Sequence, residues 1–117
     1  MQPQNCPTWW PEHLDVSAET VEVSDLHENL QIFLPLAAAL HFEMFSTHLT
    51  VTSGHDAVHG TGSKHYMWKA VDIRSKDLTR EEADRFAVAL VRLQGICSVG
   101  IFDERFIGEQ HWHVECA

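Results

Sequence analysis

Residues 63–73 read SKHYMWKAVDI, and two side chains of this stretch, His65 and Asp72, are the first candidates for a metal site. It follows a segment with three glycines, residues 54–64, which we predict to be a loop, and it ends in a β-prone run, residues 70–74, which we predict to be a strand. Asp72 lies between two apolar residues of that strand, so its carboxylate faces either solvent or a site that needs a charge. His65 and Asp72 offer an imidazole and a carboxylate, both good zinc ligands, although a single strand Asp is more often a turn or salt-bridge residue.

A second pair of candidate ligands lies near the end of the chain, where residues 111–113 read HWH. On a strand, residues i and i+2 point to the same face, with Cα atoms roughly 6.6 Å apart. His111 and His113 can therefore reach one pocket, or they can be the polar side of a half-exposed strand. Together with His65 and Asp72, one histidine of this pair completes a set of three nitrogen or oxygen ligands. Three protein ligands leave one position open for water, which is typical of a catalytic zinc site.

The flanking sequence predicts an α+β domain with helices packed on one face of a mostly antiparallel sheet. Residues 25–44 have helical apolar spacing after Ser24 as N-cap, with Pro35 expected to kink or divide the helix. A second helix opens with a capping box at residues 79–82 and is expected to end at Gly95. The predicted strands are residues 49–53, 70–74, 96–102 and 110–116. We expect residues 1–23 to be an irregular arm that packs onto a single domain of residues 24–117.

Composition and charge exclude several classes of protein. The chain has 117 residues, 44% of them hydrophobic, and a formal net charge of −9 with only eight Lys and Arg, so a nucleic-acid partner is not expected. No apolar run is long enough to span a bilayer, and residues 1–7 do not resemble a signal peptide. Three cysteines without CxxC spacing predict neither a disulfide framework nor a cysteine-rich zinc site. We expect a monomer that starts out in the cytoplasm.

Three short motifs, in this order and spacing, resemble those of the M15 peptidases. They are TSG at residues 52–54, the run from Ser63 through Asp72, and HxH at residues 111–113. M15 peptidases include the zinc D-alanyl-D-alanine carboxypeptidases and the L,D- and D,D-acting phage endolysins. The chain is also similar to the amino-terminal signalling domain of hedgehog proteins, which shares their fold, most closely around Gly54, Asp56, His59 and residues 63–73. The resemblance covers roughly residues 26–116 and implies a hedgehog/DD-peptidase-like fold with one Zn²⁺.

The resemblance assigns roles to individual residues. The positions that match the family's three zinc ligands are His65, Asp72 and His113. His111 matches a histidine that lies beside the zinc water in the carboxypeptidases, and we expect it to act in catalysis. Other members use a Glu or Asp a few residues before the last ligand as general base. In this chain Glu109 is the first candidate for that role and Glu104 the second. We also expect His65 or His113 to donate its second ring N–H to a carboxylate or carbonyl, with Glu115 as one candidate acceptor.

Three further residues are candidates for substrate binding: His59, His55 and Trp68. His59 matches a hedgehog-type loop histidine near the metal. His55 and Asp56 stand where many M15 enzymes have an Arg that holds the substrate, and Trp68 stands where many members have Gly. The missing Arg argues against dipeptide carboxypeptidase activity, while Trp68 either packs in the core or stacks on a substrate.

The resemblance implies a zinc peptidase that hydrolyses amide bonds in the stem peptides of peptidoglycan, by D,D- or L,D-type cleavage. Such a protein would reach the cell wall only if it were released there, in a bacterial or a phage context. The alternative from another class of protein is a zinc-stabilised, hedgehog-like binding module without peptidase activity. The missing Arg and the ambiguous base favour this alternative, whereas the two histidines of HxH together with His59 favour the peptidase.

Overall fold

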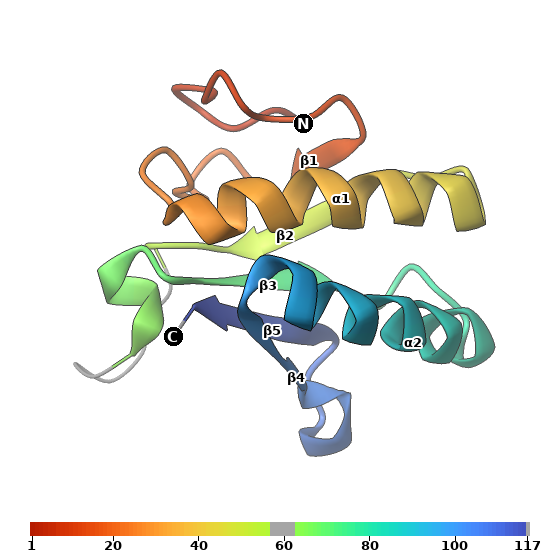
Figure 1. Ribbon diagram of the computed structural model, residues 1–117. Helices are drawn as coiled ribbons and strands as arrows, with labels where there is room; N and C mark the ends of the chain where they lie inside the picture. Colours follow the sequence, from red (N-terminus) through yellow and green to blue (C-terminus); the bar gives the residue numbers. More distant parts are fainter. Residues whose placement is uncertain (57–62, 117) are drawn as a thin grey trace.

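The computed structural model describes residues 1–56 and 63–116, which form two helices, a five-stranded sheet and two short 3-10 helices (Figure 1). The strands are β1 (Leu14–Val16), β2 (Leu49–Ser53), β3 (Ala70–Arg74), β4 (Val99–Asp103) and β5 (His111–Cys116). The helices are α1 (Glu28–Phe45) and α2 (Arg80–Cys97), and the 3-10 helices are η1 (Lys64–Met67) and η2 (Glu104–Ile107). The predicted α+β class is therefore confirmed.

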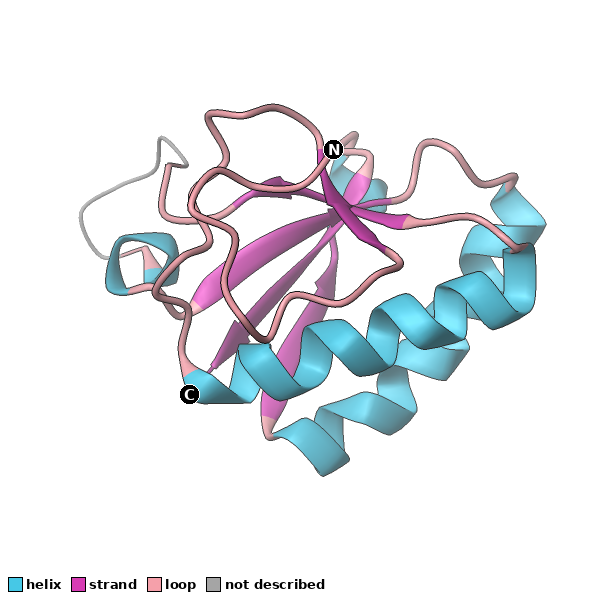
Figure 2. Ribbon diagram, turned by 90° about the horizontal axis from the view of Figure 1, so that it is seen from above, coloured by secondary structure: helices cyan, strands magenta, loops and turns pink. Residues whose placement is uncertain are grey.

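The sheet has the strand order β1-β2-β3-β5-β4, with β1 parallel to β2 and every other pair antiparallel. Both helices lie on the same face of this sheet (Figures 1 and 2). The prediction that residues 1–23 are wholly irregular was wrong, because Leu14 and Val16 are buried and β1 adds an edge strand beside β2. Trp9 and Trp10 are partly buried and pack against the core, as expected for a segment that docks on the domain.

Helix α1 begins later than predicted and is not divided by its proline. Its N-cap is His27 instead of Ser24, and the His27 ring nitrogen Nδ1 accepts a hydrogen bond from the Asn29 amide at 3.2 Å. Pro35 lies inside the helix, which continues to Phe45. Among the buried residues of α1 is His41, whose Nδ1 lies 2.9 Å from the Thr47 carbonyl oxygen.

Helix α2 confirms one end of its prediction and corrects the other. The Thr79 hydroxyl accepts a hydrogen bond from the Glu82 amide at 3.1 Å, and the Glu82 carboxylate accepts one from the Thr79 amide at 2.9 Å. This is the predicted capping box. The predicted end at Gly95 was wrong, because the helix runs to Cys97 and Ser98 caps it in the left-handed conformation, with φ of 54°. Strand β4 starts correspondingly later, at Val99.

The hydrophobic core lies between the helices and one face of the sheet. Strand β5 shows the division most clearly, since Trp112, Val114 and Cys116 are buried in the core while the alternate residues are less buried. By strand alternation, His111 and His113 point to the face that the helices leave uncovered. The three cysteines are free, with Cys97 and Cys116 buried and Cys6 exposed. No helix within the described residues is long and apolar enough to cross a membrane.

Candidate metal centre

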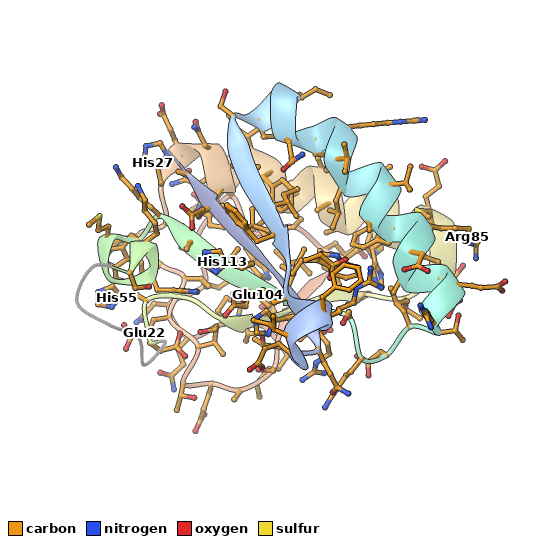
Figure 3. The ribbon with its side chains drawn as sticks, turned by 90° about the horizontal axis from the view of Figure 1, so that it is seen from below. Glu22, His27, His55, Arg85, Glu104 and His113 are labelled. Atoms are coloured by element: carbon orange, nitrogen blue, oxygen red, sulfur yellow. The ribbon has the colours of Figure 1, made fainter. Side chains whose placement is uncertain are left out.

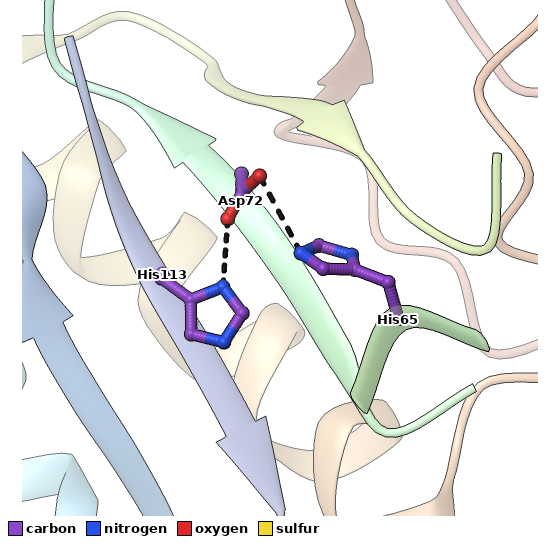
Figure 4. A group of neighbouring side chains, drawn as sticks. All are labelled: His65, Asp72 and His113. Carbon is purple, nitrogen blue, oxygen red and sulfur yellow. Dashed lines mark hydrogen bonds and ion pairs between the residues drawn. The ribbon is translucent and has the colours of Figure 1, made fainter. Parts of the chain in front are cut away.

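Three side chains from three elements meet on the uncovered face of the sheet: His65, Asp72 and His113 (Figure 4). Asp72 of β3 and His113 of β5 are direct cross-strand partners, and His65 reaches them from η1. One possible ligand atom from each residue lies within 4.8 Å of the other two. Two imidazoles and one carboxylate form a donor set suited to a divalent transition-metal ion. The residues present therefore fit a metal ion, as the sequence predicted.

His65 is held in one orientation by its local backbone. The Ser63 hydroxyl caps η1 by accepting a hydrogen bond from the His65 amide at 3.2 Å. The His65 ring is fully buried, and its Nδ1 lies 2.9 Å from the carbonyl oxygen of Gly54, so Nδ1 carries the proton and donates it. In the neutral ring, Nε2 then presents its lone pair toward Asp72 Oδ2, 3.5 Å away. A cation between these two acceptor atoms would relieve their repulsion.

The turn that supplies the Gly54 carbonyl is tied to the N-terminal segment. A Cβ at position 54 would lie 2.1 Å from the backbone oxygen of Glu22, so only glycine fits. The Asp56 carboxylate accepts hydrogen bonds from the amides of Gly54 at 2.9 Å and Glu22 at 3.0 Å. The glycine of the TSG motif thus fixes the carbonyl that orients His65.

His113 lies between two carboxylates. Its Nδ1 is 3.0 Å from Asp72 Oδ1, and its Nε2 is 2.9 Å from Glu115 Oε1. Burial lowers the pKa of His113, but the hydrogen bonds to Asp72 and Glu115 outweigh it, so the pKa lies above its ordinary value. Burial likewise raises the pKa of Asp72, yet the hydrogen bond from His113 holds it well below its usual range. Asp72 is therefore ionised, and both ligand histidines have the outer hydrogen bonds that the sequence predicted for at least one of them.

His111 forms a pair with Glu104 beside this group. Its Nε2 lies 2.8 Å from Glu104 Oε1 and 3.7 Å from Asp72 Oδ1. Glu104 is the first residue of η2, whose N-cap Asp103 accepts the Arg105 amide at 3.2 Å. Hydrogen bonds from the Arg105 side chain lower the pKa of Asp103 and hold this turn in place. As a result, Asp72, Glu104 and His111 form a second set of possible metal ligands that shares Asp72 with the first.

Two hollows are lined by residues of the site or their neighbours. One, of about 310 Å³, is lined by Ser63, His65, Phe102, Glu104, His113 and Glu115. The other, of about 330 Å³, is lined by Thr52, Arg74, Lys76, Gly108, Glu109, Gln110 and His111. The structure therefore places Glu109 in the second hollow, where it shares a wall with His111. Glu104, the second candidate for general base, lies nearer to His111 than Asp72 does, at 2.8 against 3.7 Å.

Of the expected substrate-binding residues, His55 and Trp68 are described, and neither lines either hollow. His55 stacks on Trp68 with nearly parallel rings, 4.2 Å between centroids, and its Nδ1 lies 3.1 Å from Glu22 Oε2. Trp68 has a φ of 59°, a backbone conformation that glycine adopts most readily, and its ring packs against the core. Figure 3 shows His55 and Glu22 close together, to the left of His113 and Glu104. His59 lies outside the described residues.

Comparisons with protein-family models, with curated proteins and with solved structures found no match to this chain. The likeness to M15 peptidases therefore depends on the order and spacing of the motifs quoted from the sequence. Independently of that likeness, the structure brings His65, Asp72 and His113 together and places His111 beside them.

Proposed function

We propose that this protein is a zinc-dependent peptidase of the M15 type, with a hedgehog/DD-peptidase-like fold, that hydrolyses amide bonds in peptidoglycan stem peptides. One observation carries the proposal. Two histidines and an aspartate, of which His65 and Asp72 are buried, lie together beside a hydrogen-bonded His–Glu pair, His111 and Glu104, and both histidines line a hollow. This combination provides both a metal site and a group that can take up and release a proton, which metal-assisted hydrolysis requires.

His65, Asp72 and His113 would hold the zinc ion. Two imidazoles and one carboxylate are a known set for catalytic zinc, and three protein ligands leave a position open. A zinc ion bound there would supply a Lewis acid that polarises a carbonyl and acidifies a water molecule. The burial of His65 and Asp72 keeps bulk water away from two of the three ligands.

His111 and Glu104 would act as the general acid and base. Their facing atoms, Nε2 and Oε1, are 2.8 Å apart, so one proton is shared between them. We propose that this pair accepts the proton of the attacking water and returns it to the leaving amine. The side chains of His111 and Glu104 are only 19% and 33% exposed, so the pair is accessible from the two hollows without being fully hydrated.

The decisive experiment combines metal analysis with a cleavage assay. The purified protein should contain about one zinc per chain, and it should release peptides with new amine termini from peptidoglycan, as detected by mass spectrometry. His111→Ala should keep the zinc and lose turnover by about 10²-fold or more, the usual contribution of general acid–base catalysis. His48→Ala, which removes an exposed histidine that pairs with Asp15, is the matched control and should change neither quantity.

The hedgehog-like binding module is the second candidate, and one observation favours it. His55 and Asp56, which stand at the place of the substrate-holding Arg in many M15 enzymes, are engaged in holding the N-terminal segment through Glu22. One zinc per chain with no cleavage of any stem peptide would support this module. Absence of zinc, even after reconstitution, would contradict both functions.

A further inference from the structure

The arrangement of Asp72 suggests that the site holds more than one ion. Its Oδ2 faces His65, whereas its Oδ1 faces both His113 and His111, at 3.0 and 3.7 Å. A carboxylate placed between two groups of ligands can bridge two metal ions about 3.5–4 Å apart. The second group is completed by Glu104, whose Oε1 is 2.8 Å from His111 Nε2.

These separations suit a small divalent ion. With bonds of about 2.0–2.2 Å to nitrogen and oxygen, two ligand atoms around a tetrahedral ion lie roughly 3.3–3.6 Å apart. The observed separations of 2.8 and 3.7 Å lie on either side of this range, so small side-chain rotations would admit the ion. The Arg105 side chain fixes Asp103 at the start of η2, which keeps Glu104 in place for this role.

We propose that a second divalent transition-metal ion, such as zinc, binds to Asp72, Glu104 and His111. Asp72 bridges it to the first ion, and the second ion inhibits hydrolysis. The inhibition rests on the proposed function, whereas the binding does not. His111 Nε2 has a single lone pair. An ion that binds both His111 Nε2 and Glu104 Oε1 would displace the proton shared between them, which is released to solvent. The pair can then no longer accept the proton of the attacking water.

The second ion binds more weakly than the first. The side chains of His111 and Glu104 are 19% and 33% exposed, whereas those of His65 and Asp72 are 0% and 6% exposed. In addition, Asp72 is shared, so the second ion has only two ligands of its own. Activity should therefore rise with the first equivalent of zinc and fall as further zinc is added, by about 10²-fold at saturation.

Equilibrium dialysis of the chelator-stripped protein against zinc, with elemental analysis, tests the binding directly. We expect two zinc ions per chain, one tight and one weak. His111→Ala and Glu104→Gln should each lose the weak ion and keep the tight one, while His48→Ala should keep both. A single ion at all zinc concentrations, or two ions in all three variants, would overturn the proposal.

X-ray absorption on the protein with two ions separates a bridged pair from zinc bound elsewhere on the surface. A bridged pair gives a metal–metal distance of about 3.5–4 Å. Two ions without that distance would contradict the proposal, as would activity that increases with the second ion. A protein that binds two bridged ions but hydrolyses no peptide would leave this site intact and would count against the proposed function instead.

Discussion

The substitution Asp72→Asn separates the metal-binding role of this residue from its structural role. In the metal-free protein, His65 Nδ1 donates to Gly54, so the neutral ring presents a lone pair to Asp72 Oδ2 at 3.5 Å. An asparagine side chain has the same size as an aspartate, and its NH₂ group, in place of Oδ2, can donate a hydrogen bond to that nitrogen. The remaining oxygen can still accept the hydrogen bond from His113 Nδ1, which lies 3.0 Å from Asp72 Oδ1 in the wild-type protein.

These exchanges nearly cancel in the metal-free protein. The bond from His113 changes from charge-assisted to neutral, a loss of about 1 kcal/mol, and the new bond to His65 contributes about 1 kcal/mol. We therefore expect the metal-free variant to unfold within about 1 kcal/mol of the wild type. Zinc at 1,000 times its dissociation constant stabilises the wild type by about 4.1 kcal/mol. For 117 residues this raises the Tm by about 16 °C, at about 4 °C per kcal/mol. An amide is a poor zinc ligand, so the variant should lose most of this rise.

Thermal unfolding followed by circular dichroism, with chelator and with zinc, gives the four curves needed. Asp15→Asn is the matched control, because Asp15 is also a strand aspartate beside a histidine, His48, but lies at the surface away from the site. It should retain the full zinc-dependent rise. If Asp72→Asn instead destabilised the metal-free protein by about 3–5 kcal/mol, the cost of breaking a buried ion pair, the group would be a structural ion pair and the reasoning would be refuted.

Three further predictions concern the scaffold. Burial lowers the pKa of His41, so its contribution to stability is complete above the pKa of the unfolded chain and is lost as the pH falls through the lower pKa of the folded protein. His41→Leu should therefore reduce the pH dependence of the unfolding free energy, measured in urea between pH 7 and 5. The same pH dependence in the variant and the wild type would contradict this. Gly54→Ala should destabilise the fold and weaken zinc binding, because the new Cβ would lie 2.1 Å from a backbone oxygen. Gly95→Ala, in open space on α2, should instead stabilise the fold by about 0.5–1 kcal/mol. Equal changes of the unfolding free energy in denaturant titrations would contradict both predictions. Thr79→Ala should cost about 1 kcal/mol of unfolding free energy and leave zinc content unchanged.

Features that depend on near neighbours in the chain could be predicted from the sequence. The capping box of α2 is formed by residues 79–82, and the structure shows both of its hydrogen bonds. The shared face of His111 and His113 follows from strand alternation, and β5 alternates as expected. The meeting of His65, Asp72 and His113 is a long-range contact, and it was predictable only because the order of the motifs resembles a known family.

Features that depend on distant backbone contacts were missed. Strand β1 is three residues long and is stabilised by pairing with β2, so nothing in its own sequence distinguishes it from a loop. Gly95 resembles a helix end, but α2 continues because Leu93 and Cys97 are buried. The contact of Glu104 with His111 depends on the 3-10 turn of η2, which folds residue 104 back toward β5. The family resemblance places the general base a few residues before the last ligand, and this favours Glu109, which is closer in sequence to His113.

The register of β5 links the core to the candidate metal centre. Trp112 and Val114 pack under the helices, and the residues between and beside them carry the imidazoles of the site. Because side chains alternate along a strand, a shift of one residue would place both histidines in the core and expose the tryptophan. The burial of Trp112, at 1% exposure, therefore fixes which face receives His113. The apolar residues of HWHV determine the geometry of the ligands. A change in packing at Trp112 should therefore alter the affinity for the metal as well as the stability of the fold.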